Sequence, residues 1–538
     1  MRQATITRRE FVRRGGAAAG ASALALGASR LCAGEAQAAP ASAKGARLNF
    51  ILMEGDDLNF ATLGCMGDPL VKTPNIDRLA ARGVLFRNNI CQGTMCAPSR
   101  NSLLTGSYPH NTGVFHNQDG TMAAGVWSFP AALKRAGYFT ALVGKNHFKP
   151  HSDAGAGQEA EPGASEEGAK TLGFEYVHSI GGKVVSASKR PTTPGINPYQ
   201  DYLQERGLMD KLVEFYAKNR KGGNDWVAAN VVPEEHYQDC YIASRAIDWL
   251  RGYKESKPYL LWVDFVAPHP PADAPEPYAS MYDWKAMPLP LDDPLTGALP
   301  TLKTRAEARK KRVAPDETKR FRAGYYAMIS LLDAQVGRIV KIVEDRGELD
   351  HTVFVFFGDQ GSMLYDHWLF GKGVFYKGSI NSPLVIAGPP AWRRGEKVER
   401  PVELLDVAPT ILELAGAGEE DRKACRGTSL TPLLTGEGEY RRPFAFAEDA
   451  DTKMVANERY KLVAYPDFTM LFDLQADPNE LKNIAQDHPD VVKDLKGRID
   501  EWLAATGPVR EPNPKPRRGR PAGKRGAAPA GKSKAKSE

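Results

Sequence analysis

Four short apolar runs constrain the fold of this chain more than any other feature. They are continuous rather than alternating and are bounded by turn-prone residues, which is typical of strands buried on both faces of a parallel sheet. Capped helix signals such as Thr73-Pro74 and Ser128-Phe-Pro130 punctuate the chain between them. This alternation predicts an α/β fold with a doubly wound, mostly parallel sheet. The runs cover residues 48–53, 138–143, 258–266 and 351–357.

Polar residues of the kinds that bind metals and anions follow each of these runs. Doubly wound folds bind ligands outside the carboxyl ends of their strands, where such residues meet. The sequence therefore predicts a functional site at one edge of the sheet. Its expected members are Asp56 and Asp57 after the first run, Lys145 and His147 after the second, His269 after the third, and Asp359 and Gln360 after the fourth.

Oxygen ligands dominate the metal site that this pattern predicts. The two aspartates after the first run and Asp359 supply carboxylates, and Gln360 supplies a carbonyl oxygen. Such a set suits a hard cation, Ca²⁺ or Mg²⁺. Two aspartates after one strand often form only a turn or a helix cap, but the D-Q-G sequence after a second strand favours a shared ion. A zinc site would be expected to include histidine, which neither of these strand ends supplies.

The stretch from Cys91 to Gly106, C-Q-G-T-M-C-A-P-S-R-N-S-L-L-T-G, carries the predicted nucleophile. Cys96 precedes a proline, a hydroxyl and the fixed cation Arg100, and residues 99–104 are expected in a helix. At position i+4, Arg100 can reach back toward Cys96, and the positive helix end favours loss of a proton there. Cys91 lacks such convergence and is predicted to be an ordinary buried cysteine.

The run C-A-P-S-R followed by L-L-T-G resembles the signature of the type I sulfatases. Further matches to that family extend over most of the chain. They are T-P-N-I-D-R-L, G-Y-x-T-x-x-x-G-K-x-H, A-P-H-x-P, D-Q-G with a later G-K, and L-F-D-L-x-x-D-P-x-E-x-x-N. The resemblance implies an alkaline phosphatase-like fold and a metal-dependent hydrolase of sulfate esters, with Ca²⁺ as the first expectation and Mg²⁺ as the alternative.

The same resemblance implies a role for each candidate residue. A formylglycine-generating enzyme would oxidise Cys96 to formylglycine, whose hydrate coordinates the metal and attacks sulfur. Arg100 would orient this diol. The remaining assignments are Lys145 and Lys372 for the sulfate oxygens, His147 for orienting the nucleophile or taking its proton, and His269 for protonating the leaving oxygen.

Two features refine this comparison with the family. Gln360 stands where the family usually has Asn or His, so this chain departs from the family at one expected ligand position. The loop M-L-Y-D-H-W-L-F-G-K resembles the branch that also contains choline sulfatases and phosphonate monoester hydrolases, in which a basic and aromatic loop borders the substrate. Asn117 and His367 are therefore expected to bind substrate.

The N-terminal residues 1–38 are typical of a twin-arginine signal peptide. They contain Thr7-Arg8-Arg9-Glu10-Phe11-Val12, a weakly polar run over 15–28 and the small-residue cleavage motif Ala36-Gln37-Ala38. The run is too short to span a bilayer, which needs about 20 apolar residues, so no integral membrane segment is expected after processing. The Tat translocase is the expected partner, and the location would be periplasmic or secreted.

Charge and composition divide the remainder of the chain. The net charge of +6 comes from the two ends, because the residues between them carry more acidic than basic side chains. Such a body has no nucleic-acid footprint. We expect a catalytic domain over 39–430, a C-terminal α+β subdomain with a short antiparallel sheet over 431–508, and a disordered basic tail over 509–538. Residues 151–235 show little periodicity and are predicted to form long surface loops.

The sequence thus favours an exported sulfatase that acts on a sulfated carbohydrate, with a small alkyl or aryl sulfate as the next choice. One alternative keeps the same nucleophile but hydrolyses phosphonate or phosphate diesters. A different class of protein also remains open, in which the site is vestigial and the basic tail binds polyanions.

Overall fold

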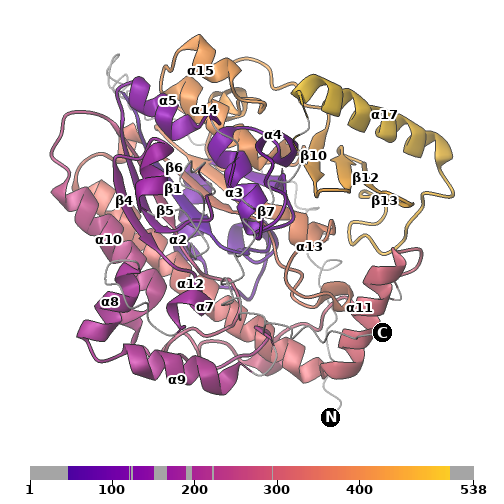
Figure 1. The fold of residues 1–538 in the computed structure, drawn as a ribbon, viewed down its shortest axis with the longest axis horizontal. Helices are drawn as coiled ribbons and strands as arrows, with labels where there is room; N and C mark the ends of the chain where they lie inside the picture. Colours follow the sequence, from indigo (N-terminus) through magenta and orange to yellow (C-terminus); the bar gives the residue numbers. More distant parts are fainter. Residues whose placement is uncertain are drawn as a thin grey trace, which may run out of the picture.

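The protein is described by a computed structural model, which covers residues 47–510 apart from 120, 123–124, 149, 151–165, 189–196, 221–222, 294 and 509. The predicted signal peptide, and all of the predicted basic tail except Arg510, therefore lie outside the described residues. A large sheet forms the centre of the molecule, and a smaller sheet lies beside it (Figure 1).

The large sheet confirms the predicted fold class. Its order is β4-β3-β5-β1-β6-β7-β2-β8, with β9 paired to β2, and β1 lies between two parallel neighbours, β5 and β6. Strand β7 runs antiparallel to β6 and β2, so the sheet is mostly parallel. The strands are β1 (Asn49–Gly55), β2 (Val84–Ile90), β3 (Phe139–Lys145), β4 (Tyr176–Ile180), β5 (Tyr259–Asp264), β6 (Thr352–Gly358), β7 (Asn381–Ala387), β8 (Glu396–Val398) and β9 (Val402–Glu403).

Helices cover both faces of this sheet, which explains why the central strands are continuously apolar. Residues 50–53 of β1 are fully buried. Helices α2, α10 and α12 pack together on one face, and α3, α5 and α14 pack together on the other (Figure 1). These helices are α2 (Pro74–Arg82), α3 (Cys96–Thr105), α5 (Phe129–Arg135), α10 (Gln238–Gly252), α12 (Pro315–Asp345) and α14 (Val407–Leu414).

The remaining helices are shorter or lie at the periphery. Among the described residues, no helix is both long and apolar enough to cross a membrane. The shorter or peripheral helices are α4 (Pro109–Thr112), α6 (Glu166–Thr171), α7 (Lys183–Ser186), α8 (Pro198–Glu205), α9 (Met209–Asn219), α11 (Pro300–Arg312), α13 (Lys377–Ile380), α15 (Glu419–Lys423), α16 (Thr431–Thr435) and α17 (Pro489–Thr506).

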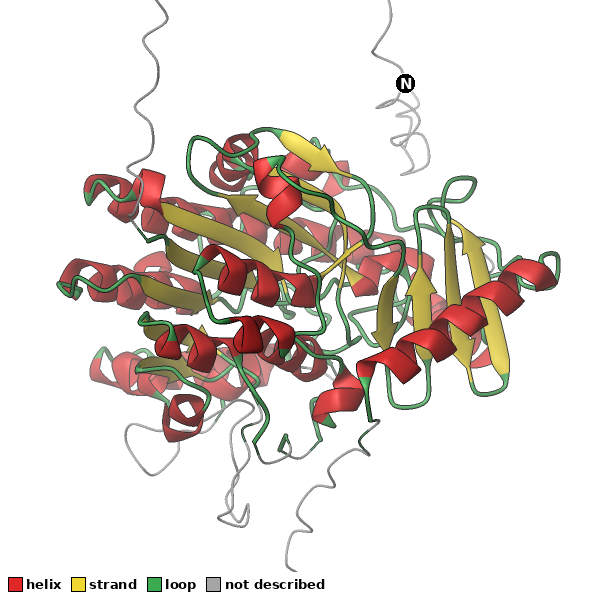
Figure 2. Cartoon of the chain, turned by 90° about the horizontal axis from the view of Figure 1, so that it is seen from above, coloured by secondary structure: helices red, strands yellow, loops and turns green. Residues whose placement is uncertain are grey.

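The small sheet is an antiparallel meander, as expected for the C-terminal part of the chain. It comprises β10 (Ala445–Glu448), β11 (Lys453–Ala456), β12 (Tyr460–Tyr465) and β13 (Phe468–Asp473), and α17 packs across one face (Figure 2). Phe446 and Leu471 of the sheet form a core with Trp502 of the helix. The boundary near residue 430 stays a prediction. Arg442 beyond it forms a buried ion pair with Glu403 before it.

The segment predicted as long loops is in large part regular. Within 151–235, the structure has helices α6 to α9 and strand β4, which pairs in parallel with β3 at the sheet edge. The prediction of loops was wrong there because these elements are short and half-exposed, which leaves little hydrophobic periodicity to detect. Strand β2 was also not anticipated, since only its first three residues, Val84 to Phe86, form an apolar run.

Candidate functional site

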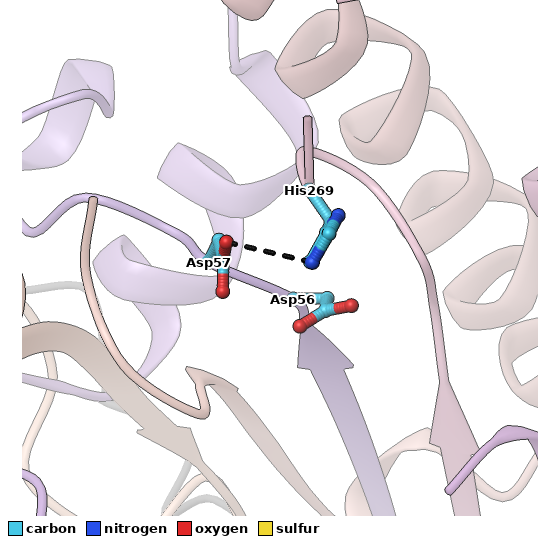
Figure 3. Close-up of side chains that lie close together, drawn as sticks. All are labelled: Asp56, Asp57 and His269. Atoms are coloured by element: carbon cyan, nitrogen blue, oxygen red, sulfur yellow. Dashed lines mark ion pairs between the residues drawn. The ribbon is translucent and has the colours of Figure 1, made fainter. Parts of the chain in front are cut away.

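The four predicted strand ends meet at one edge of the large sheet. The strand register brings these ends to the same level. Glu54 of β1 pairs with Asp264 of β5, and Gly55 pairs with Gly358 of β6. The residues that follow these positions therefore project into the same space. In the close-up of Figure 3, Asp56 and Asp57 lie beyond the end of β1 and His269 approaches from the neighbouring loop.

Cys96 lies at the start of α3 and faces this space with its side chain fully buried. Its Sγ is 3.4 Å from Asp56 Oδ1 and 3.8 Å from Asp57 Oδ1. Lys372 Nζ lies 2.6 Å from the sulfur, and Gln360 Nε2 lies 3.3 Å from it. Burial and the Asp56 charge raise the pKa of the Cys96 thiol well above its usual value, so the unmodified thiol is a poor source of thiolate.

Arg100, one turn further along α3, is fully buried among carboxylates rather than directed only at Cys96. Its Nε lies 2.8 Å from Asp359 Oδ2, and its Nη1 lies 3.1 Å from both Glu54 Oε1 and Asp264 Oδ1. Its Nη2 lies 3.6 Å from Asp56 Oδ1. Although burial opposes it, this negative surrounding holds the pKa of Arg100 well above its usual value. The guanidinium therefore stays charged and holds three strand ends together.

Glu54 and Asp264 are site residues that the sequence analysis missed. Both are fully buried, and Trp262 Nε1 donates to each of them, at 2.9 Å and 3.1 Å. Burial raises the pKa of Glu54 well above its usual value and also raises that of Asp264. Each is an acid at the end of a buried strand, which is the one signal that could have identified it.

Asp359 and Gln360 support an oxygen-rich metal site. Asp359 Oδ1 accepts hydrogen bonds from the backbone amides of Asp57, at 3.0 Å, and Gln360, at 2.9 Å. Burial raises the pKa of Asp359 to about 7. Gln360 Oε1 is buried and accepts no hydrogen bond within the described part of the chain. An orphaned acceptor beside several carboxylates is what a bound cation would satisfy.

The distances in this cluster also fit a metal ion. One ligand atom each from Asp56, Cys96 and Asp359 lie within 4.8 Å of one another, and Asp56, Asp57 and His269 form a second such group. Among the described residues of the cluster, positively charged side chains are fewer than carboxylates. A divalent ion would offset the remaining negative charge, so the charges of the cluster also suit a metal.

Lys145 and Lys372 balance the two aspartates that follow β1. Lys145 forms an ion pair with Asp56, and Lys372 forms one with Asp57. Burial would raise the pKa of Asp56, but Lys145 and the other nearby cations hold it well below its usual range. Both ammonium groups border the space around Cys96, where an anionic group of a substrate would need them.

The two histidines differ in their surroundings. His147 is buried, and its Nδ1 has no hydrogen-bond partner among the described residues. Burial and the neighbouring Lys145 hold the pKa of His147 well below its usual value, which favours the neutral ring. The role of His147 in orienting the nucleophile stays a prediction.

His269 keeps 23% of its side chain exposed and faces the site with Nε2, which lies 3.8 Å from Asp57 Oδ2 (Figure 3). Its Nδ1 lies 2.6 Å from the carbonyl oxygen of Pro270. Because a carbonyl can only accept, Nδ1 carries a proton and Nε2 is left to exchange protons with the site. Burial lowers the pKa of His269 to about 4.

Asn117 and His367, the two candidates for substrate contact, have structural partners. Asn117 Oδ1 accepts from the backbone amide of Ala97 at 2.8 Å, which steadies the first turn of α3. His367 is buried, pairs with Asp293 at 2.5 Å and stacks on Tyr376 with ring centroids 4.5 Å apart. It braces the loop that carries Lys372. Contact of either residue with substrate stays a prediction.

Comparisons with known proteins show what the chain is similar to. The family model described as Sulfatase matches residues 48–417, and the model described as N-sulphoglucosamine sulphohydrolase, C-terminal, matches residues 365–505. An arylsulfatase of Clostridium perfringens is 28% identical and covers 84% of this chain and 92% of its own. An N-acetylglucosamine-6-O-sulfatase of Bacteroides thetaiotaomicron is 26% identical and covers 81% and 82%.

A solved structure shows the same arrangement. The crystal structure of a phosphonate monoester hydrolase of Agrobacterium radiobacter superposes with a TM-score of 0.70 at 25% identity, and the alignment covers 86% of this chain and 96% of the other. The similarity therefore includes both the large sheet and the small one.

The replacement Arg100→Met should destabilise the protein strongly. Removing the guanidinium leaves buried carboxylates without their cation, a change that typically costs about 3–5 kcal/mol. We expect urea denaturation to report this loss in the free energy of unfolding. The control is Arg87→Met, whose partner Glu399 is 3.2 Å away and largely exposed, and it should cost no more than about 1 kcal/mol. Similar small losses in both variants would contradict the bridging role.

Proposed function

Because this chain belongs to the sulfatase family and is a sulfuric ester hydrolase, we propose that it uses a formylglycine made from Cys96 and a divalent cation to hydrolyse sulfated carbohydrates. The observation that carries the proposal is the position of Cys96. Its sulfur lies within 4 Å of two aspartates, an amide and a lysine that arrive from three other segments of the chain. The similarity to the N-acetylglucosamine-6-O-sulfatase supports the carbohydrate as the substrate class.

The residues around the site define what each can contribute. A cation held by Asp56, Asp57, Asp359 and Gln360 would supply positive charge to the sulfate oxygens and acidify an adjacent hydroxyl. Formylglycine, as its hydrate, would supply one hydroxyl to attack sulfur and a second whose deprotonation expels sulfate. Lys145 and Lys372 would exchange their present carboxylate partners in part for the oxygens of the substrate.

His269 is the proposed proton donor for the leaving alcohol. Its Nδ1 is occupied by the Pro270 carbonyl, so only Nε2 can pass a proton to the leaving oxygen. Burial disfavours the charged ring, whereas a bound sulfate ester places a negative charge beside it and favours the imidazolium. The donor state is thus promoted by the substrate itself.

A phosphonate monoester hydrolase is the second candidate, because a solved enzyme of that kind has the same fold at 25% identity. A phosphonate monoester and a sulfate monoester both carry one negative charge, so the cations of the site do not distinguish them. Turnover of paired aryl sulfate and aryl phosphonate esters by one preparation would separate the two. A strong preference for the phosphonate would overturn the first choice.

The replacement Cys96→Ala should abolish turnover while the fold remains. Alanine cannot be converted to an aldehyde, so we expect a fall in kcat/KM of at least about 10³-fold on a sulfate ester. The matched control is Cys91→Ala, which removes another fully buried thiol five residues away and should stay within about 3-fold of wild type. Mass spectrometry of the peptide across Cys96 completes the test, and an unmodified thiol in protein from its native host would refute the nucleophile assignment.

Removal of divalent metal should lower both activity and thermal stability. A ligand that binds only the folded state stabilises it by mass action, so Ca²⁺ or Mg²⁺ added to chelator-treated protein should raise Tm. This rise should vanish in Asp359→Asn but persist in Asp333→Asn, a buried carboxylate on α12 that binds backbone amides at the start of α2. Full activity of the metal-free protein would contradict the metal site.

We also propose export by the twin-arginine route, with a periplasmic or secreted location. A folded reporter fused to residues 1–38 should leave the cytoplasm, and Arg8→Lys with Arg9→Lys should retain it, because a receptor reads this pair. The control Arg13→Lys with Arg14→Lys changes a second arginine pair in the same leader and should leave export intact. Export that ignores the first pair would rule out this route.

A further inference from the structure

Asp273 is a fully buried carboxylate four residues after His269, and neither the mechanism above nor the sequence pattern gives it a role. It lies in the loop that follows β5, and the same loop carries His269. What surrounds Asp273 therefore bears on how firmly His269 is held.

Four side chains converge on Asp273. Lys183 Nζ donates to Oδ1 at 2.7 Å, and Tyr237 OH donates to the same oxygen at 2.9 Å. Tyr216 OH and Asn230 Nδ2 donate to Oδ2, at 2.6 Å and 2.9 Å. The donors come from α7, α9 and the segment before α10. Burial raises the pKa of both tyrosines well above the usual value, so their hydroxyls remain protonated donors.

Backbone contacts secure the loop on either side of Asp273. Ala272 donates its amide to Trp226 O at 3.1 Å and accepts from the amide of Ala228 at 3.2 Å. Ala274 O accepts from the amide of Asn230 at 3.1 Å. These bonds form a short parallel bridge with residues 226–230, and the Asp273 side chain ties that bridge to Lys183.

The loop is also anchored at its beginning. Asp239 Oδ1, at the start of α10, accepts from the amides of Val266 and Ala267, both at 2.9 Å. Only residues 268–272 lie between this anchor and Asp273, and three of them are prolines, whose φ angles are fixed. Fixing both ends of so stiff a segment fixes the place of His269 as well.

We infer that Asp273 is a positioning residue for the proton donor His269, acting through the loop that its four donors lock in place. The inference rests on the proposed function, because it takes His269 as the group that protonates the leaving oxygen. The contacts around Asp273 also extend to a second residue of the site. Lys183, one of its donors, directly follows Gly182, and Gly182 packs against the Lys145 side chain. A β-carbon at Gly182 would lie 3.3 Å from Lys145 Cε.

General acid catalysis gives a readout that simple loss of stability would not produce. An acidic phenol can depart without a proton, whereas an alcohol of a sugar or alkyl group needs one. A displaced His269 should therefore slow an alkyl sulfate far more than 4-nitrophenyl sulfate. In Asp273→Asn, we expect kcat/KM to fall about 10-fold or more for the alkyl ester and less than about 3-fold for the aryl ester.

Three further variants make the experiment decisive. His269→Ala should show the same selective loss, only larger. Tyr237→Phe removes one donor without burying an unpaired charge, so it replaces Asp273→Asn if that variant fails to fold, and a smaller loss with the same selectivity is expected. Asp333→Asn alters an equally buried carboxylate that holds α2, and it should leave the ratio of the two substrates unchanged.

The outcomes distinguish failure of the positioning role from failure of the proposed function. If His269→Ala is selective but the Asp273 and Tyr237 variants slow both esters equally, or neither, the positioning role is overturned while the proposed function stands. If His269→Ala slows both esters equally, the proton-donor role itself fails and the inference fails with it. Selective losses in all three variants support both.

Discussion

The packing of four acidic side chains at one edge of a sheet is the constraint on which this structure depends. Four acidic side chains are fully buried there and out of contact with water: Glu54, Asp56, Asp264 and Asp359. Arg100 contacts all four. A buried charge is tolerated only when it is paired and hydrogen-bonded, so the site and the fold share one electrostatic foundation.

Backbone geometry supplies the second half of that foundation. Strand β3 must approach β5 closely before it delivers Lys145, and Gly144 makes this possible: its φ is +113°, and a β-carbon would lie 2.0 Å from the carbonyl oxygen of Asp264. The same stretch of β5 holds the carboxylate that faces Arg100. Close strand packing and charge pairing therefore reinforce each other at this point.

The sequence predicted the sheet, and the meeting of candidate site residues at its edge, for one physical reason. A strand that is buried on both faces must be apolar throughout, so the first polar residues after it mark its carboxyl end, as Asp56, Lys145 and Asp359 do. Glu54 and Asp264 lie at the same strand ends, but the sequence around them gives no sign of their partner, the buried cation Arg100. No local pattern records a partner that distant in sequence.

The region around Lys183 shows the other limit of sequence-based prediction. Helices α6 to α9 are short and bury only part of each turn, so their periodicity is weak and the chain resembles loops. Their positions depend on tertiary contacts, such as those that converge on Asp273. His367 shows a related limit, since its partner Asp293 lies 74 positions earlier. Such pairings require the fold to be known first.

The complete burial of Cys96 has a consequence for the order of events in the life of the protein. Once α3 has packed into the fold, Cys96 is fully buried, too deep for a modifying enzyme to enclose the residue in its own active site. The oxidation proposed for this residue must therefore act on the nascent or unfolded chain. Under the proposed mechanism, a molecule that folded before modification would keep its thiol and stay inactive, so the relative rates of modification and folding would set the supply of active protein.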